Sequence, residues 1–178
     1  MQYLEVRRHT MRIKPGQHLS QAGVNLARRV GDSMGPFDKV ITSTVPRAFE
    51  TAIAMGFAVD EQYEQLSSLG DDVDAEIEWS AGFAEFARVV RRGKATARFA
   101  HMQLELWRSI VAASPDDECA LIITHGGIVE AGAVACLPDA DHSAWGTSCG
   151  YCEGVRLSFD GGDFTGIKVL QIGSPLLV

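Results

Sequence analysis

The sequence predicts an α/β fold, a three-layer αβα sandwich with a mainly parallel sheet and an antiparallel edge strand. Short apolar runs alternate with longer segments of helical periodicity, which is the pattern of strand–helix units. The run at 118–124, "ECALIIT", is apolar almost throughout, as in a strand that is covered on both faces. Two later alternating runs, 153–159 and 164–172, flank Gly161 and Gly162, which indicates a hairpin at one edge.

The first part of the chain contains two predicted strand–helix pairs. The strands are expected at 3–9 and 38–43, and the helices at 19–34 and 45–57. Ser20 has a side chain that accepts hydrogen bonds from the first turn of a helix, so we expect it to be an N-cap. Pro46 falls in the first turn of the second helix, where proline is tolerated.

The middle of the chain is less regular. The acidic stretch at 67–79 has no helical or strand periodicity, and we expect it to be an irregular segment. Three further helices are expected at 82–92, 95–113 and 125–137. No linker or internal repeat interrupts this order, so the sequence predicts one domain over residues 1–178.

Bulk composition excludes several classes of protein. The net charge of −7 argues against a nucleic-acid-binding protein, which would carry a basic excess. No apolar run approaches the roughly 20 residues of a membrane span. The first residues have the pattern of a strand and not of a signal peptide. We therefore expect a cytoplasmic protein that binds neither nucleic acid nor membrane; nothing in the sequence specifies an oligomeric state.

The chain contains four cysteines, and two of them, Cys149 and Cys152, form the segment "CGYC". A CxxC spacing can bind zinc or carry redox chemistry, but no second CxxC and no paired histidines accompany this one. Cysteines that pack as small apolar side chains are the preferred interpretation. A zinc or redox role remains the alternative.

Polar side chains follow three of the predicted strands. His9 stands at the end of the first strand, Arg47 opens the helix after the second, and His125 follows the "ALIIT" strand. In open α/β sheets, ligands bind outside the carboxyl ends of the strands. The three side chains are therefore expected to meet at one crevice.

The residues around these positions suit an anionic ligand. Arg8 and Arg12 flank His9, and guanidinium groups match the geometry of phosphate oxygens. Gly126 and Gly127 stand where a helix N-terminus is expected to meet the ligand with free backbone N–H groups. The sequence thus predicts a phosphate site.

Four segments together resemble the histidine phosphatase superfamily, also called the phosphoglycerate mutase-like family. They are "RHT" at 8–10, "LSQAG" at 19–23, "STVPRAFETA" at 43–52 and "ITHGGIVEA" at 123–131. The resemblance implies that His9 is a nucleophile that forms a phosphohistidine. It also implies that Arg8, Arg47 and His125 hold the phosphoryl group, and that no metal or other cofactor is needed.

Two positions depart from the family pattern. Thr10 stands where the family has glycine, and its side chain is expected either to contact the substrate, as Arg12 and Gly126 would, or to be a simple turn residue. The family's acidic residue after the second helix, which protonates the leaving oxygen, is replaced by serine in "LSSLG". Asp72 is the candidate for a substitute acid; a solvated acidic loop is the preferred alternative.

The missing acid and the short chain resemble the small phosphohistidine-phosphatase-like branch of the family, whose P–N substrates need less help in leaving. The expected function is a metal-independent phosphatase that hydrolyses a phosphorylated small molecule or a phosphoprotein through phospho-His9. Two alternatives remain open. One is a catalytically weak module that binds phosphate or phosphopeptides, and the other is a phosphoryl transferase of the phosphoglycerate mutase type.

Overall fold

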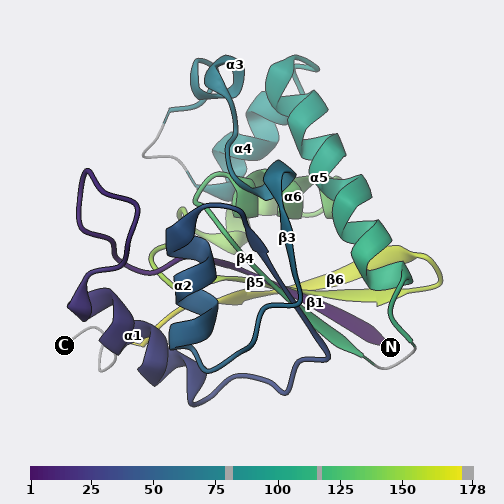
Figure 1. The fold of residues 1–178 in the computed structure, drawn as a ribbon. Helices are drawn as coiled ribbons and strands as arrows, with labels where there is room; N and C mark the ends of the chain where they lie inside the picture. Colours follow the sequence, from purple (N-terminus) through teal and green to yellow (C-terminus); the bar gives the residue numbers. More distant parts are fainter. Residues whose placement is uncertain (79–81, 116–117, 174–178) are drawn as a thin grey trace.

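The fold is built on one six-stranded sheet (Figure 1). The computed structural model describes residues 1–78, 82–115 and 118–173. In chain order the strands are β1 (Gln2–Arg8), β2 (Lys39–Ser43), β3 (Glu61–Tyr63), β4 (Cys119–Thr124), β5 (Gly154–Asp160) and β6 (Asp163–Leu170). Across the sheet their order is β3-β2-β4-β1-β5-β6.

The direction of the strands changes twice across the sheet, on either side of β5. β3, β2, β4 and β1 run parallel, whereas β5 is antiparallel to β1 and β6 is antiparallel to β5. Gly161 and Gly162 both have positive φ in the turn between β5 and β6, so the predicted hairpin forms there. The predicted fold class is confirmed, and the antiparallel edge is this hairpin.

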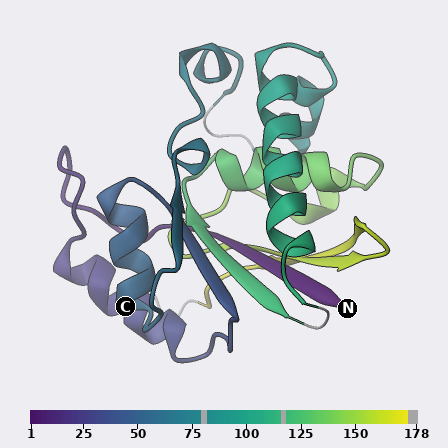
Figure 2. The ribbon, with the colours of Figure 1, turned by 45° about the vertical axis from the view of Figure 1, so that its right-hand side comes forward.

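Helices cover both faces of the sheet (Figures 1 and 2). The helices are α1 (Gln21–Gly31), α2 (Pro46–Ala54), α3 (Asp71–Asp74), α4 (Phe83–Val90), α5 (Ala95–Ala112) and α6 (Ile128–Cys136). α1 and α2 lie on one face, and α4, α5 and α6 lie on the other. Two short 3-10 helices follow β3 and α6, at Glu64–Leu66 and His142–Trp145.

The central strand β4 has apolar side chains on both faces of the sheet. Leu121 and Ile123 pack into the apolar cluster beneath α1 and α2, whereas Ala120 and Ile122 pack into the cluster with α5 and α6. Successive side chains of a strand point to opposite faces, so a strand between two helical layers must be apolar at every position. This outcome confirms the interpretation of "ALIIT".

Local signals at the helix starts also match the structure. Ser20 is the N-cap of α1, and its hydroxyl oxygen accepts a hydrogen bond from the backbone N–H of Gly23 at 3.1 Å. Pro46 is the first residue of α2, where its missing N–H leaves no hydrogen bond unmade.

Two short elements were not predicted. β3 has only three residues, and it forms because it pairs with β2 at the edge of the sheet. α3 is a single helical turn within the acidic stretch that was expected to be irregular. Neither is long enough to show a periodicity in the sequence. None of the helices within the described ranges has the length and apolarity required to cross a bilayer.

Candidate active site

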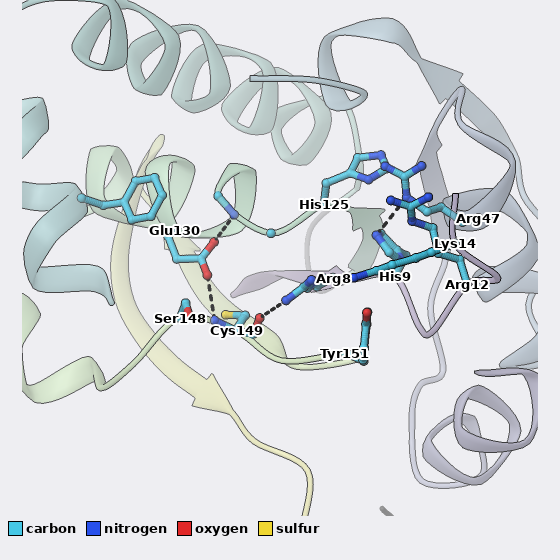
Figure 3. Close-up of a pocket in the computed structure, with 13 residues that line it drawn as sticks. Arg8, His9, Arg12, Lys14, Arg47, His125, Glu130, Ser148, Cys149 and Tyr151 are labelled. Carbon is cyan, nitrogen blue, oxygen red and sulfur yellow. Dashed lines mark hydrogen bonds between the residues drawn. The ribbon is translucent and has the colours of Figure 1, made fainter. Parts of the chain in front are cut away.

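A cavity of about 300 Å³ lies where β1 and β4 end (Figure 3). Its wall contains two histidines, His9 and His125, which directly follow these strands. Its cationic side chains are Arg8, Arg12, Lys14 and Arg47. The structure therefore brings together the three side chains that were expected to meet from separate strand ends.

The ring of His9 is held in one orientation by two hydrogen bonds. Its Nδ1 lies 2.6 Å from the carbonyl oxygen of Thr10, which can only accept, so Nδ1 carries the proton. Its Nε2 lies 3.0 Å from Nε of Arg47, which can only donate. Nε2 is therefore the unprotonated nitrogen, and its lone pair accepts the hydrogen bond from the Arg47 guanidinium.

The surroundings of His9 keep its imidazole neutral. The pKa of His9 is lowered to about 4, mainly by burial and also by the guanidinium groups of Arg47, Arg8 and Arg12, whereas the hydrogen bond to Thr10 raises it. A neutral imidazole retains the lone pair that an attack on phosphorus needs. At pH 7 the neutral form is thus the dominant one.

His125 is arranged as a hydrogen-bond donor. Its Nε2 lies 2.8 Å from Oγ of Ser43, and that oxygen also accepts a bond from the backbone N–H of Val45 at 3.3 Å. When Ser43 donates its hydroxyl hydrogen to Nε2, the proton of His125 lies on Nδ1. Nδ1 is buried and has no partner among the described residues, so it is available to a phosphoryl oxygen.

Arg8 presents a second buried donor without a partner. Its Nη1 donates to the carbonyl oxygen of Cys149 at 2.9 Å, and the guanidinium carbon lies 4.7 Å from the centre of the Tyr151 ring. Its Nε is buried, with no partner in the described part of the chain. A Cβ on Gly126 would lie 3.2 Å from this Nε. Gly126 thus leaves room for Arg8 at the edge of the cavity.

Thr10 does not line the cavity, and the expectation that it contacts the substrate is not supported. Its side chain is fully buried, and its hydroxyl donates to the carbonyl oxygen of Gly23 at 3.0 Å. Its backbone N–H donates to Oγ1 of Thr51. These contacts fix the turn after β1 to α1 and α2, so the side chain supports the position of His9 from behind.

Asp72 lies away from the cavity. It is exposed in α3 and lines a separate hollow together with Arg98 and Phe99. The structure therefore does not support Asp72 as a general acid, and the alternative of a solvated acidic segment is the better description.

Asparagine at position 72 is expected to change activity very little. Because Asp72 does not reach the cavity, kcat/KM of Asp72→Asn should stay within about twofold of the wild type on any phosphate substrate, below 0.5 kcal/mol in transition-state energy. The comparison is made over pH 5–8. A loss of tenfold or more in kcat alone would restore Asp72 as the acid.

The "CGYC" segment forms part of the wall of the cavity. Cys149 accepts the hydrogen bond from Arg8, and Tyr151 lies against the same guanidinium. Burial raises the pKa of both Cys149 and Cys152, the latter to about 11, whereas redox and zinc-binding thiols have lowered values. Among the described residues no cluster of three or more potential ligands surrounds a metal position. Packing and wall formation thus account for this segment.

Glu130 is a residue of the cavity wall that the sequence analysis missed. Its side chain is fully buried, and its two oxygens accept hydrogen bonds from the backbone N–H groups of Gly127 at 2.6 Å and Cys149 at 2.7 Å. Burial raises the pKa of Glu130, and these amides act in the opposite direction. Glu130 therefore joins the loop after β4 to the segment whose carbonyl holds Arg8.

Glutamine at position 130 is expected to weaken the site. A carboxamide offers one oxygen to two N–H donors, so one of the two loops loses its partner at a cost of about 1–3 kcal/mol. We expect the free energy of unfolding to fall by that amount and kcat to fall about tenfold or more, because Arg8 loses its fixed position. Urea titration and steady-state kinetics measure both. Glu105→Gln, at an exposed position on α5, is the control.

The pKa values of the two histidines predict an unusual pH dependence. Burial and the neighbouring cations lower the pKa of His125 to about 3 and that of His9 to about 4, so both rings gain a proton only well below pH 6.5. We expect kcat/KM, after correction for the ionisation of the substrate, to remain constant as the pH falls through 6.5 and to decline only near pH 4. A decline of the corrected kcat/KM with a midpoint near 6.5 would contradict the prediction that both histidines are neutral.

Comparisons with known proteins agree with this geometry. The model of the histidine phosphatase superfamily (branch 1) matches residues 5–170. The chain belongs to the histidine phosphatase superfamily. Among curated proteins, no match was found.

Several solved structures have the same fold. A phosphoserine phosphatase from Entamoeba histolytica, in complex with 3-phosphoglyceric acid, aligns with a TM-score of 0.72 at 14% identity over 99% of this chain and 100% of its own. A mycobacterial glucosyl-3-phosphoglycerate phosphatase aligns at 0.65 with 21% identity over 94% and 98%. Bacillus stearothermophilus YhfR aligns at 0.62 with 24% identity over 93% and 95%.

Proposed function

We propose that this histidine phosphatase superfamily member is a metal-independent phosphatase that works through a phosphohistidine on Nε2 of His9. The observation that carries the proposal is the state of this atom, which is unprotonated at pH 7, accepts a hydrogen bond from Arg47 and lies in the cationic cavity. Phosphoryl transfer requires positioning and stabilisation of charge on the equatorial oxygens. Arg8 Nε and His125 Nδ1, both buried donors without a partner among the described residues, supply that stabilisation.

The proposed reaction has two displacements. In the first, the lone pair of His9 Nε2 attacks phosphorus, and the bond from phosphorus to the leaving oxygen or nitrogen breaks with its electron pair. In the second, water attacks the same phosphorus, the P–N bond breaks with its electron pair returning to Nε2, and the oxygen and protons of the water leave in inorganic phosphate. The imidazole returns to its starting state, with Nδ1–H still bonded to Thr10.

The acidic groups available in the cavity wall restrict which leaving groups can depart. Glu130 is the sole carboxylate among the described residues that line the cavity, and both of its oxygens are engaged by backbone amides. No side-chain acid is therefore offered to a departing alkoxide. An aryl oxide, or an imidazole that already carries a proton on its second nitrogen, leaves without such help. We infer a preference for phosphoramidates and aryl phosphates over alkyl phosphates.

The same feature favours a second candidate function, a module that binds phosphate or phosphopeptides with little turnover. Hydrolysis of phosphohistidine, an aryl phosphate and an alkyl phosphate by wild type and His9→Ala separates the two. The phosphatase proposal expects turnover in the order phosphoramidate and aryl before alkyl, all lost in His9→Ala. Tight phosphate binding with no turnover of any of the three would instead establish the binding module.

Transfer to a second acceptor, as in a mutase, is the third candidate. It would require phosphorus to appear on an added alcohol and not in inorganic phosphate. Product analysis in the presence of a hydroxylated acceptor distinguishes it, since the proposed hydrolase releases only inorganic phosphate.

A further inference from the structure

The cavity holds more positive charge than one phosphoryl group requires. Two guanidinium groups, those of Arg8 and Arg47, balance the charge of about −2 on a bound phosphoryl group. Arg12 and Lys14 add two further cations to the same wall. None of the four has an ion-pair partner among the described residues, and Glu130 is engaged by backbone amides. A surplus of unpaired cations in one cavity calls for a further anion.

The loop that carries these two cations is held in place by its own hydrogen bonds. Arg12 pairs with Leu19 in an antiparallel bridge, and the N–H of Ile13 donates to the carbonyl of His18 at 3.0 Å. Glu50 of α2 holds the returning arm, because one of its oxygens accepts the N–H of Leu19 at 2.9 Å and the other bonds to the His18 ring. A loop fixed in this way presents its side chains at defined positions.

The tip of this loop is tied to the catalytic side chains as well. The side-chain oxygen of Gln17 accepts a hydrogen bond from Nη1 of Arg47, whose Nε donates to His9. Nη1 of Arg12 donates to the carbonyls of Pro15 and Gly16, which fixes its guanidinium at the base of the tip. The loop and the nucleophile therefore form one connected unit.

The surplus cations lie on one side of the nucleophile. In Figure 3, Arg12 and Lys14 are grouped with Arg47 beside His9, whereas Glu130 lies at the opposite end of the cavity. Lys14 makes no hydrogen bond or ion pair with any residue in the described ranges, and its ammonium is therefore free to meet a ligand.

We propose that Arg12 and Lys14 form a second anion subsite, and that the substrate is a phosphorylated compound whose organic part carries another anionic group. That group is a carboxylate or a second phosphate, which share the chemistry of oxygen acceptors with negative charge. Arg12 offers a planar fork and Lys14 a mobile ammonium. The inference rests on the proposed function for the phosphoryl end of the substrate.

Three compounds that share a two-carbon chain and one phosphate test the subsite. Ethyl phosphate has no second charged group, phosphoglycolate has a carboxylate in place of the methyl group, and ethylene glycol bisphosphate has a second phosphate. We expect kcat/KM to be about tenfold higher for at least one of the two compounds with a second anionic group than for ethyl phosphate. Lys14→Met should reduce this preference to about twofold. Lys168→Met removes the same charge from an exposed position on β6, and it should keep the preference.

Binding to His9→Ala gives the same answer without turnover. Calorimetric Kd values for the three compounds should show the same preference of about tenfold, again reduced by Lys14→Met. Equal Kd values for all three, or a preference that survives Lys14→Met, would overturn the subsite while leaving the phosphatase proposal intact. The wild-type protein could instead prefer the compounds with a second anionic group but hydrolyse none of the three and no aryl phosphate. That result would overturn the phosphatase proposal and support the subsite. The better of the two charged ligands identifies the second group.

Discussion

Alanine at position 9 is expected to lower kcat/KM by on the order of 10⁴-fold or more, the scale for loss of a covalent nucleophile. The side chain of His9 supplies an unprotonated nitrogen that lies among the cations of the cavity. Water would have to attack the substrate directly in its place. Initial rates on an aryl phosphate measure the loss.

The control for this variant is His101→Ala, at an exposed position on α5. It removes an imidazole without touching the cavity and should retain full activity. Circular dichroism and thermal unfolding of both variants check that the fold is kept. A His9→Ala protein that is folded and retains more than a few per cent of wild-type kcat would rule out nucleophilic catalysis by His9.

Alanine at position 8 is expected to lower kcat by about 10³-fold, the scale for removal of one donor from a pre-organised oxyanion site. Arg8 is held by the carbonyl of Cys149 and by the face of Tyr151, so its unpartnered Nε needs no rearrangement to meet a phosphoryl oxygen. Because charge grows on these oxygens in the transition state, kcat should fall by more than KM rises.

Lysine at position 8 tests whether geometry or charge matters. An ammonium restores the charge but not the planar fork that places Nε toward the ligand while Nη1 is bound to Cys149. We therefore expect Arg8→Lys to recover less than a tenth of the lost activity. Arg98→Ala, which removes an exposed arginine outside the cavity, should behave as wild type. Full recovery of activity in Arg8→Lys would show that Arg8 contributes only its positive charge.

The parts of the fold that the sequence predicted are those with a long or uninterrupted pattern. The apolar run of β4 and the helical stripe of Ala100, Trp107 and Val111 both report burial directly, and burial decides the layers of the sandwich. β3 was missed because three residues show no period, and it exists only through its pairing with β2.

The residues of the candidate site likewise divide into those that the sequence could predict and those that it could not. His9 and His125 could be found because each directly follows a strong strand pattern, and parallel strands end at the same edge of the sheet. Lys14 gave a weaker signal, as a cation shortly after the predicted nucleophile. Glu130 and Tyr151 gave none, because hydrogen bonding between distant segments brings them to the cavity.

Thr10 illustrates why a departure from a family pattern cannot be interpreted from the sequence alone. Its side chain could have entered the cavity or turned away from it, and the backbone after β1 decides the matter. In the structure the hydroxyl of Thr10 points toward Gly23, so the side chain does not occupy the cavity. Asp72 is the reverse case, since a carboxylate near the right place in the chain lies in a different hollow.

The measurement that tests the central claim most directly is the identification of the phosphorylated atom. The wild-type protein is mixed with excess aryl phosphate, quenched during turnover in alkaline denaturant, and analysed by peptide mass spectrometry and by ³¹P NMR. We predict one phosphoryl group on His9, attached to Nε2, stable to base and lost in acid. Phosphate on a different residue, phosphate on Nδ1 of His9, or product release with no phosphoenzyme at any quench time would contradict the account.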